Sequence, residues 1–409
     1  MHPIGSLIHK PRRVIVMRNQ LKNSYLFIFV VTLVYSVVFV ASEHLQGALW
    51  DDEIGFWDTS LEFSHQLLPS LSQIQDYNQF NTPLPFIVFG ILEYLFRLGP
   101  FAARLLSFFS SLGIAFLIGW PTDKSSIRSI FSLLGLFLFP FFLLLSGRLY
   151  TDIIAAFLGL IGTVLYLQNR HFVSGISFAL AIACRQFMIA FPAAIATHEL
   201  VRSIYCRKWP SLSFFVPAGA ALTILIWVAF FGDLAPATAI ANRSVPENQQ
   251  SLFALSVNNG LYSLSTLGWA YVIPEFLLLN RQFKFSKAAL IKLILIAVVM
   301  IPLFLSFPPL QTSLSVFTRV TNKLPYEWLS LSLFMILGIL TCWRFSRIDL
   351  AFWMILFNSG IMMKAVAWDK YALPIIVIFW YFQARNIDSR DDFLSLRCRS
   401  TDIPQVARN

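Results

Sequence analysis

The sequence predicts an all-α, polytopic membrane protein with about 12 transmembrane helices and a long loop after the first of them. Hydrophobic residues make up 57% and charged residues 13% of its 409 positions, and the mean hydropathy is +0.68. A soluble globular protein is far less apolar. The basic residues lie in short segments between apolar runs, so the net charge of +10 reflects membrane topology. We expect membrane lipids, and no nucleic acid, among the partners.

The chain begins with a basic segment, residues 1–23, that carries five lysines and arginines. An apolar run over 24–41 follows it, and the two together resemble a cleaved signal peptide. Many more apolar runs follow, however, which favours a retained first transmembrane helix. We therefore expect residues 1–23 to form a cytoplasmic basic N-terminus.

Eleven further apolar runs are candidate transmembrane helices. Together with the first run they predict a transmembrane domain over 24–384, followed by a cytoplasmic basic tail over 385–409. An even number of spans places both termini on one side of the membrane. The eleven runs lie at 101–120, 129–146, 153–168, 172–186, 187–200, 211–231, 261–279, 288–305, 327–343, 349–363 and 371–384.

The distribution of basic residues supports this layout. Segments on the side of the two termini hold 21 lysines and arginines, and segments on the opposite side hold 9. The positive-inside rule therefore places both termini in the cytoplasm. The stretch from Glu43 to Glu93 contains no lysine or arginine, so we expect residues 42–100 to form a first loop on the outer side.

Two helices are expected within this first outer loop. The run from Thr82 to Phe96 is apolar, but counting it as a span would reverse the charge bias of every later loop. Pro83 and Pro85 suit the first turn of a helix. We predict an interfacial helix there and a second, amphipathic one around Ile54 to Leu68.

An acidic cluster, W-D-D-E-I-G-F-W-D over residues 50–58, is the most conspicuous polar stretch. It places four carboxylates in nine residues after the first span. Each charge would cost roughly 2.5 to 3.5 kcal/mol inside the bilayer, so the chain must surface here. Such a cluster is a candidate site for proton abstraction or cation binding. The four cysteines show no metal-ligand spacing, and we assign no metal site.

Three other polar segments fall on the same predicted side as the acidic cluster, and we expect all four to converge on one outward-facing chamber. Each has a structural alternative. Asp152 can cap the next helix, Arg185 can extend its charge to the interface, and Lys370 can anchor its helix end there. The three segments are Arg148–Asp152, Arg185–Gln186 and Trp368–Tyr371.

These residues resemble a known superfamily. Three motifs are similar to motifs of GT-C glycosyltransferases, which use polyprenyl-phosphate sugars. They are an Asp-Asp or Asp-Glu pair after the first span, the proline-bearing segment Asn81–Pro85 and the Lys-Tyr-x-x-Pro motif Lys370–Pro374. The resemblance implies a GT-C-like bundle and extends over most of the chain. Within the superfamily, the dolichyl-phosphate-glucose alpha-1,2-glucosyltransferase family is most similar, through Asp52-Glu53-Ile54, Tyr150-Thr151-Asp152 and Arg185-Gln186.

The sequence also departs from that family. Trp368–Tyr371 lacks the histidine of the family's Asn-Arg-His-Tyr motif, and Gln186 is not followed by Thr-Asn. The sugar and the acceptor therefore stay open. A bacterial relative that acts on an undecaprenyl-linked glycan fits as well as an endoplasmic-reticulum enzyme, so the bacterial plasma membrane and the endoplasmic-reticulum membrane are both compatible locations.

The resemblance implies a role for each candidate residue. Asp52 is the general base of a direct, inverting displacement, and Glu53 is its possible substitute as a catalytic residue. Cationic and hydroxyl side chains bind the donor phosphate. No cofactor is required; a divalent ion at the acidic cluster is compatible with the chemistry. The expected phosphate-binding residues are Arg185, Lys370 and Tyr371, and the expected substrate-binding residues are Tyr150, Asp152 and Gln186.

The expected function is inverting transfer of a hexose, with glucose favoured, from a polyprenyl-phosphate donor to a glycan or lipid-linked acceptor on the outer or lumenal face. A polyprenyl-linked glycan polymerase or ligase is the alternative, although such enzymes usually carry their long catalytic loop late in the chain. A secondary transporter is a more remote alternative, because it would show internal repeats and a polar site near mid-membrane.

Overall fold

The computed structural model describes residues 10–122, 126–242, 247–251, 253–280, 286–309 and 315–387, and every regular element in these ranges is helical. The predicted basic N-terminus and the predicted basic tail lie partly outside the described residues. Their cytoplasmic placement stays a prediction.

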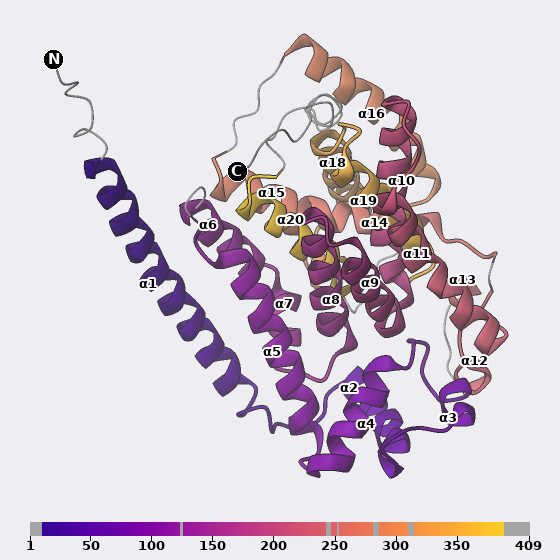
Figure 1. Ribbon diagram of the computed structural model, residues 1–409. Coiled ribbons are helices and arrows are strands. Elements are labelled where there is room, and N and C mark those ends of the chain that lie inside the picture. The colour runs from indigo at the N-terminus through magenta and orange to yellow at the C-terminus, as the bar shows by residue number, and fades with distance from the viewer. Residues whose placement is uncertain are drawn as a thin grey trace.

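The N-terminal part of the bundle consists of α1 (Lys10–Ala41), α5 (Pro100–Gly119), α6 (Ser126–Phe137) and α7 (Pro140–Ser146). Helix α1 runs along one edge of the molecule, beside α5 and α6 (Figure 1). Between α6 and α7 the chain bends by 80°. Pro140 begins α7, where its missing amide hydrogen costs no helical hydrogen bond.

Four helices form the middle of the bundle. They are α8 (Thr151–Leu167), α9 (His171–Cys184), α10 (Ala190–Tyr205) and α11 (Leu212–Phe231). Helix α9 ends where Arg185 adopts an extended backbone, and a short 3-10 turn, η2 (Gln186–Ile189), leads into α10. The chain is therefore unwound at Arg185, which leaves backbone groups there outside any helix.

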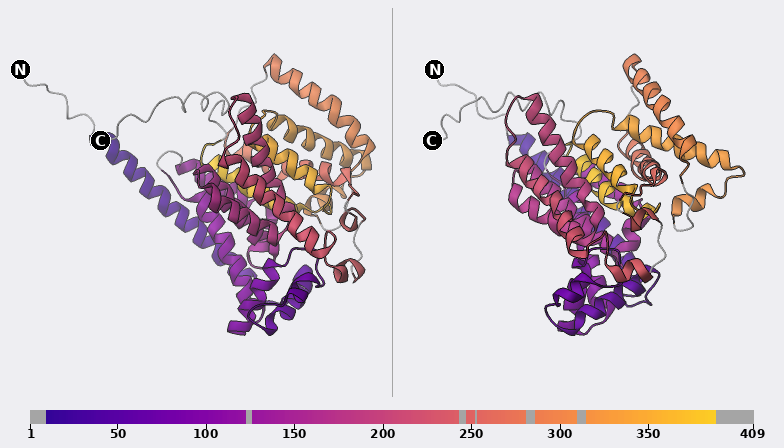
Figure 2. Two further views of the ribbon diagram at one scale, coloured as in Figure 1. Left: turned by 45° about the vertical axis from the view of Figure 1, so that its right-hand side comes forward. Right: turned by 90° about the vertical axis from the view of Figure 1, so that its right-hand side faces the viewer.

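The C-terminal part is built on α14 (Val257–Leu267), which continues through the π-helical turn η3 (Gly268–Val272) into α15 (Ile273–Leu278). Helix α16 stands at the edge of the molecule and packs mainly on α18 (Figure 2). The remaining elements are α12 (Ala237–Asn242), α13 (Glu247–Gln250), α16 (Lys287–Ser306), α17 (Val316–Thr321), α18 (Glu327–Arg344), α19 (Leu350–Met362), η4 (Asp369–Ala372) and α20 (Leu373–Ala384).

The prediction of an all-helical, polytopic membrane protein is confirmed. All twelve predicted runs fall on helices. In the described part of the chain, six helices are long and apolar enough to cross a membrane, or seven if the bent pair α6–α7 is one span. Several other runs form shorter apolar helices, such as α8, α9 and α19. Helix α9 is shortened by the break at Arg185.

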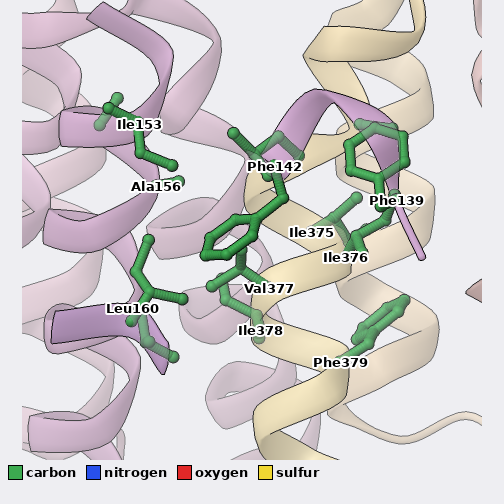
Figure 3. Close-up of a cluster of buried hydrophobic side chains, with 14 of the residues drawn as sticks. Phe139, Phe142, Ile153, Ala156, Leu160, Ile375, Ile376, Val377, Ile378 and Phe379 are labelled. Atoms are coloured by element: carbon green, nitrogen blue, oxygen red, sulfur yellow. The ribbon is translucent and has the colours of Figure 1, made fainter. Parts of the chain in front are cut away.

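Helix α20 is the centre of the bundle, because every one of its residues is buried. Figure 3 shows its apolar side chains, among them Ile375 and Val377, beside Phe142 of α7, with Ile153, Ala156 and Leu160 of α8 on the far side of Phe142. In lipid the hydrophobic effect between helices is weak, so close packing holds such a helix in place. The loop that precedes α20 is therefore attached to a rigid element.

The first loop folds into its own group of short helices. It contains α2 (Asp52–Glu62), the 3-10 turn η1 (Phe63–His65), α3 (Leu71–Gln75) and α4 (Leu84–Phe96). These helices gather at the end of the molecule opposite the start of α1 (Figure 1). Helix α4 packs mainly against α2 and η1, and to a smaller extent against α5 and α9. Helices thus occur where two interfacial ones are expected, and their position in the interface stays a prediction.

Candidate active site

The acidic cluster and the last polar segment meet in an ion pair. Lys370 Nζ lies 2.5 Å from Asp52 Oδ2. The lysine side chain is 1% exposed, whereas that of Asp52 is 31% exposed and open to solvent. The ammonium also lies 3.4 Å from the Trp368 ring centre and 5.0 Å from that of Tyr150. Burial lowers the pKa of Lys370, and the adjacent carboxylate and aromatic rings stabilise its charged form.

Asp369, the neighbour of Lys370, fixes this segment to the bundle. Its carboxylate is fully buried and accepts hydrogen bonds from the Phe317 amide, at 3.0 Å, and from the Tyr262 hydroxyl. These partners lie on α17 and α14. Lys370 is thus held between a buried anchor on its N-terminal side and the central helix α20 on its C-terminal side. In the sequence, Asp369 stands out only as part of the Trp368–Tyr371 segment.

Arg185 is the second buried cation, and the unwound backbone between α9 and η2 presents it. Its guanidinium donates to the Asp152 carboxylate and to the side-chain carbonyl of Asn81. It also lies 5.6 Å from the ring centres of Phe187 and Tyr371. Asp152 is in the first turn of α8, where the helix dipole favours its negative charge.

The first loop is fastened onto this break in the chain. The Gln186 side-chain amide donates to the Phe80 carbonyl oxygen at 2.5 Å, and the Thr82 hydroxyl donates to the Ile182 carbonyl oxygen at 2.7 Å. Together with the bond from Arg185 to Asn81, these contacts place the Asn81–Pro85 motif directly against the α9–α10 junction. Gln186 therefore has a structural contact of its own.

Glu53 and Asp52 have different surroundings although they are adjacent. The Glu53 carboxylate is fully buried and accepts two bonds from Arg104, at 2.9 and 3.0 Å, and one from Arg148 at 3.1 Å. The same carboxylate also accepts hydrogen bonds from the backbone amides of Leu149 and Trp50, at 2.7 and 3.1 Å. A carboxylate with five donors is poorly placed to accept a substrate proton. The geometry favours Asp52 over Glu53 as a base.

Asp51 precedes α2 in a strained conformation, with φ 54° and ψ −125°. This region suits glycine, and other residues occupy it at a cost. Burial and the neighbouring Asp52 raise the pKa of the Asp51 carboxyl. Asp58, the fourth carboxylate, is exposed on α2. Asp51 thus holds this conformation directly before Asp52, the first residue of α2.

Tyr150 links the acidic cluster to the α8 terminus. It is almost fully buried, and its ring meets that of Phe56 on α2 edge to face, with centroids 5.7 Å apart. Its ring also faces Lys370. All eight residues expected in the site are thus brought to one end of the bundle. Six of them form two direct groups, Asp52 with Lys370 and Tyr150, and Asp152 with Arg185 and Tyr371.

A cavity of about 310 Å³ adjoins the Arg185 group. Its polar part includes Asn81, Arg185, Gln186 and Tyr371. Its other part is apolar and is formed mainly by α11, η2 and α19. The apolar lining includes Phe187, Ile189, Ile224, Trp227, Val228 and Ile361. A cavity lined by both cationic and apolar side chains suits an amphiphilic anion such as a lipid phosphate.

In the described part of the chain, no group of three or more histidine, cysteine, aspartate and glutamate side chains is arranged to hold a metal ion.

No protein-family model matches the sequence. No curated protein matches it either. Among solved structures, the chain is similar to the crystal structure of ArnT from Cupriavidus metallidurans in the apo state, with 15% sequence identity and a TM-score of 0.39. The similarity covers 88% of this chain and 76% of that one. The likeness is distant, so the function proposed below rests on the contacts within this chain.

Proposed function

We propose that the protein is a GT-C-type membrane glycosyltransferase that takes a sugar from a polyprenyl-phosphate donor. The observation that supports this most strongly is the solvent-accessible Asp52 held against the buried Lys370, beside a cavity lined by cationic and apolar side chains. A base, a phosphate site and a lipid site are the three parts that such a transfer requires. The motif resemblance to GT-C enzymes is consistent with this arrangement.

The donor would lie with its phosphate near Arg185, Lys370 and Tyr371. Arginine binds phosphate through two parallel hydrogen bonds, and lysine acts as a point charge. The isoprenoid chain would follow the apolar wall formed by Ile224 and Trp227 toward the membrane. Asp152 would keep Arg185 oriented.

The chemistry needs one proton transfer and one displacement. Asp52 removes the proton from the acceptor hydroxyl while that oxygen attacks the anomeric carbon of the sugar. The bond from this carbon to the phosphate oxygen breaks, its electron pair stays on the phosphate, and the configuration inverts. Lys370 and Arg185 stabilise the charge that develops on the leaving phosphate. When the donor binds, Lys370 pairs with the donor phosphate instead of with the Asp52 carboxylate. Asp52 is then free to act as the base.

The finer assignments belong to the same proposal. We propose a hexose donor, with glucose favoured by the Asp52-Glu53-Ile54, Tyr150-Thr151-Asp152 and Arg185-Gln186 motifs. The acceptor is a glycan or a lipid-linked glycan. The site faces the outer or lumenal side, with both termini in the cytoplasm, in a bacterial plasma membrane or an endoplasmic-reticulum membrane.

The test is a transfer assay with the purified protein in liposomes. Polyprenyl-phosphate glucose, mannose and arabinose are offered separately, with a glycan and lipid extract of the source membrane as acceptor. We expect glucose to be consumed fastest. Faster consumption of the mannose or arabinose donor would support the proposed enzyme class and contradict glucose as its sugar. Equal consumption by a variant in which Asp52 and Lys370 are both alanine would contradict the proposal.

A further inference from the structure

The cavity contains a cation that the mechanism above does not use. Lys364 follows the end of α19 and lines the same cavity as Arg185. Arg185 and Lys370 are each paired with a carboxylate, Asp152 and Asp52. Lys364, by contrast, donates to a neutral group, the Ser251 carbonyl oxygen, at 2.5 Å, and makes no salt bridge with a described residue.

The charge of the cavity is therefore unbalanced. Among the described residues, its lining contains two cations, Arg185 and Lys364, and no aspartate or glutamate. Asp152 compensates the guanidinium of Arg185, which leaves the ammonium of Lys364 as the excess positive charge. An ammonium has three donors, and the Ser251 carbonyl takes one of them. Two donors are thus available to an anion in the cavity.

The ammonium is not needed to hold the surrounding backbone. The side chain of Asn248 donates to the carbonyl oxygens of Met363 and Ala365, at 3.0 and 3.1 Å. The Asn259 side chain donates to the same Ala365 oxygen at 2.6 Å, and the Ser256 amide donates to that of Met363 at 2.9 Å. Four bonds thus hold the residues on both sides of Lys364 without the use of its ammonium, whose one hydrogen bond is to Ser251.

We propose that Lys364 is a phosphate-binding residue for the lipid-phosphate substrate. This inference deepens the proposed function and rests on it for the identity of the ligand. The ligand class follows from the lining: an anion is attracted by Lys364, while Ile224, Trp227 and Val228 provide an apolar wall for a lipid chain. On this proposal Lys364 joins Arg185 and Tyr371, which line the same cavity, in contacting the phosphate.

The experiment measures the affinity of the full-length protein for undecaprenyl phosphate in nanodiscs, with undecaprenol as the uncharged probe. Lys364→Gln and Lys364→Met remove the charge, Lys364→Arg retains it, and Lys323→Gln removes an exposed lysine elsewhere. We expect both neutral variants to raise Kd about tenfold or more for the phosphate and to leave undecaprenol binding unchanged. The arginine and Lys323 variants should stay near the unmodified protein.

Unchanged phosphate affinity in the two neutral variants would overturn the inference. A lower unfolding temperature in both of them, without a change in affinity, would also overturn it, because the bond to Ser251 would then be the function of the ammonium. Equal affinity of the unmodified protein for undecaprenyl phosphate and undecaprenol would contradict the proposal that the cavity binds the phosphate group. Loss of phosphate binding in the neutral variants, together with no glycosyl transfer by the unmodified protein, would support Lys364 and contradict the proposed function.

Discussion

The ammonium of Lys370 lies 2.5 Å from the Asp52 carboxylate, although 318 positions separate the two residues. This pair joins the first loop to the segment that precedes the central helix α20. Each charge compensates the other in a partly dehydrated site, where an unpaired charge is costly. The pair therefore represents a resting state, in which the proposed base and one proposed phosphate ligand neutralise each other until a donor arrives.

Glu53→Gln tests whether Glu53 has a structural role. The change removes the charge that Arg104 and Arg148 share, so the free energy of unfolding should fall by about 3 to 5 kcal/mol, as for other broken buried ion pairs. Glu62→Gln, at an exposed position on the same helix, is the control and should change little. Thermal unfolding in detergent measures both. A Glu53→Gln protein of unchanged stability would show that the buried network does not hold the first loop.

Asp51→Gly tests the strained backbone before α2. Glycine adopts the positive φ of this position without steric cost, so the variant should be more stable by roughly 1 kcal/mol. Asp51→Asn keeps most of the strain and serves as the control. Chemical or thermal unfolding of both variants provides the comparison. A Gly variant that is less stable than the Asn variant would mean that the conformation of Asp51 is not strained in the folded protein.

Gly135→Ala tests the packing of α6 on the central helix. A Cβ atom at Gly135 would lie 2.2 Å from the Trp380 ring, so one of the two helices must move. We expect a loss of about 1 to 3 kcal/mol. Gly219→Ala on α11 has free space around its new Cβ and should be neutral or slightly stabilising. Similar unfolding temperatures for the two variants would contradict the close packing of Gly135 on Trp380, and with it the contact between α6 and α20.

The predicted topology is tested by labelling from the two sides of the membrane. In a background without native cysteines, single cysteines replace Ser72 in the first loop and Ser286 before α16, both of which are exposed. An impermeant thiol reagent added to sealed, right-side-out vesicles should label the first position and spare the second. Labelling of Ser286→Cys, with protection of Ser72→Cys, would reverse the orientation.

The helices and the converging polar residues were predictable because the chain is so apolar. In such a background every charged residue near a helix end is conspicuous, and Asp52, Asp152, Arg185 and Lys370 were identified in this way. The structure pairs these four residues with one another. Which carboxylate meets which cation was not predictable, because that depends on how helices far apart in the sequence pack.

Other features depended on three-dimensional packing throughout. Arg104 lies inside a predicted span and gives no sign in the sequence that it binds Glu53. Lys364 resembles any lysine at a helix end until the cavity beside it is known. The extended backbone at Arg185 also leaves no pattern in the sequence. The runs 172–186 and 187–200 therefore predict two spans, without the unwound junction that presents Arg185 to the cavity.

The central claim is that Asp52 removes the acceptor proton, and the most direct measurement is the transfer rate of Asp52→Asn beside Asp58→Asn. The first variant keeps the size of the side chain and loses its basicity, so transfer should fall by ~10² or more while donor affinity is retained. Asp58 lies exposed on the same helix, and its variant should transfer at a nearly normal rate. Near-normal transfer by Asp52→Asn would contradict the account.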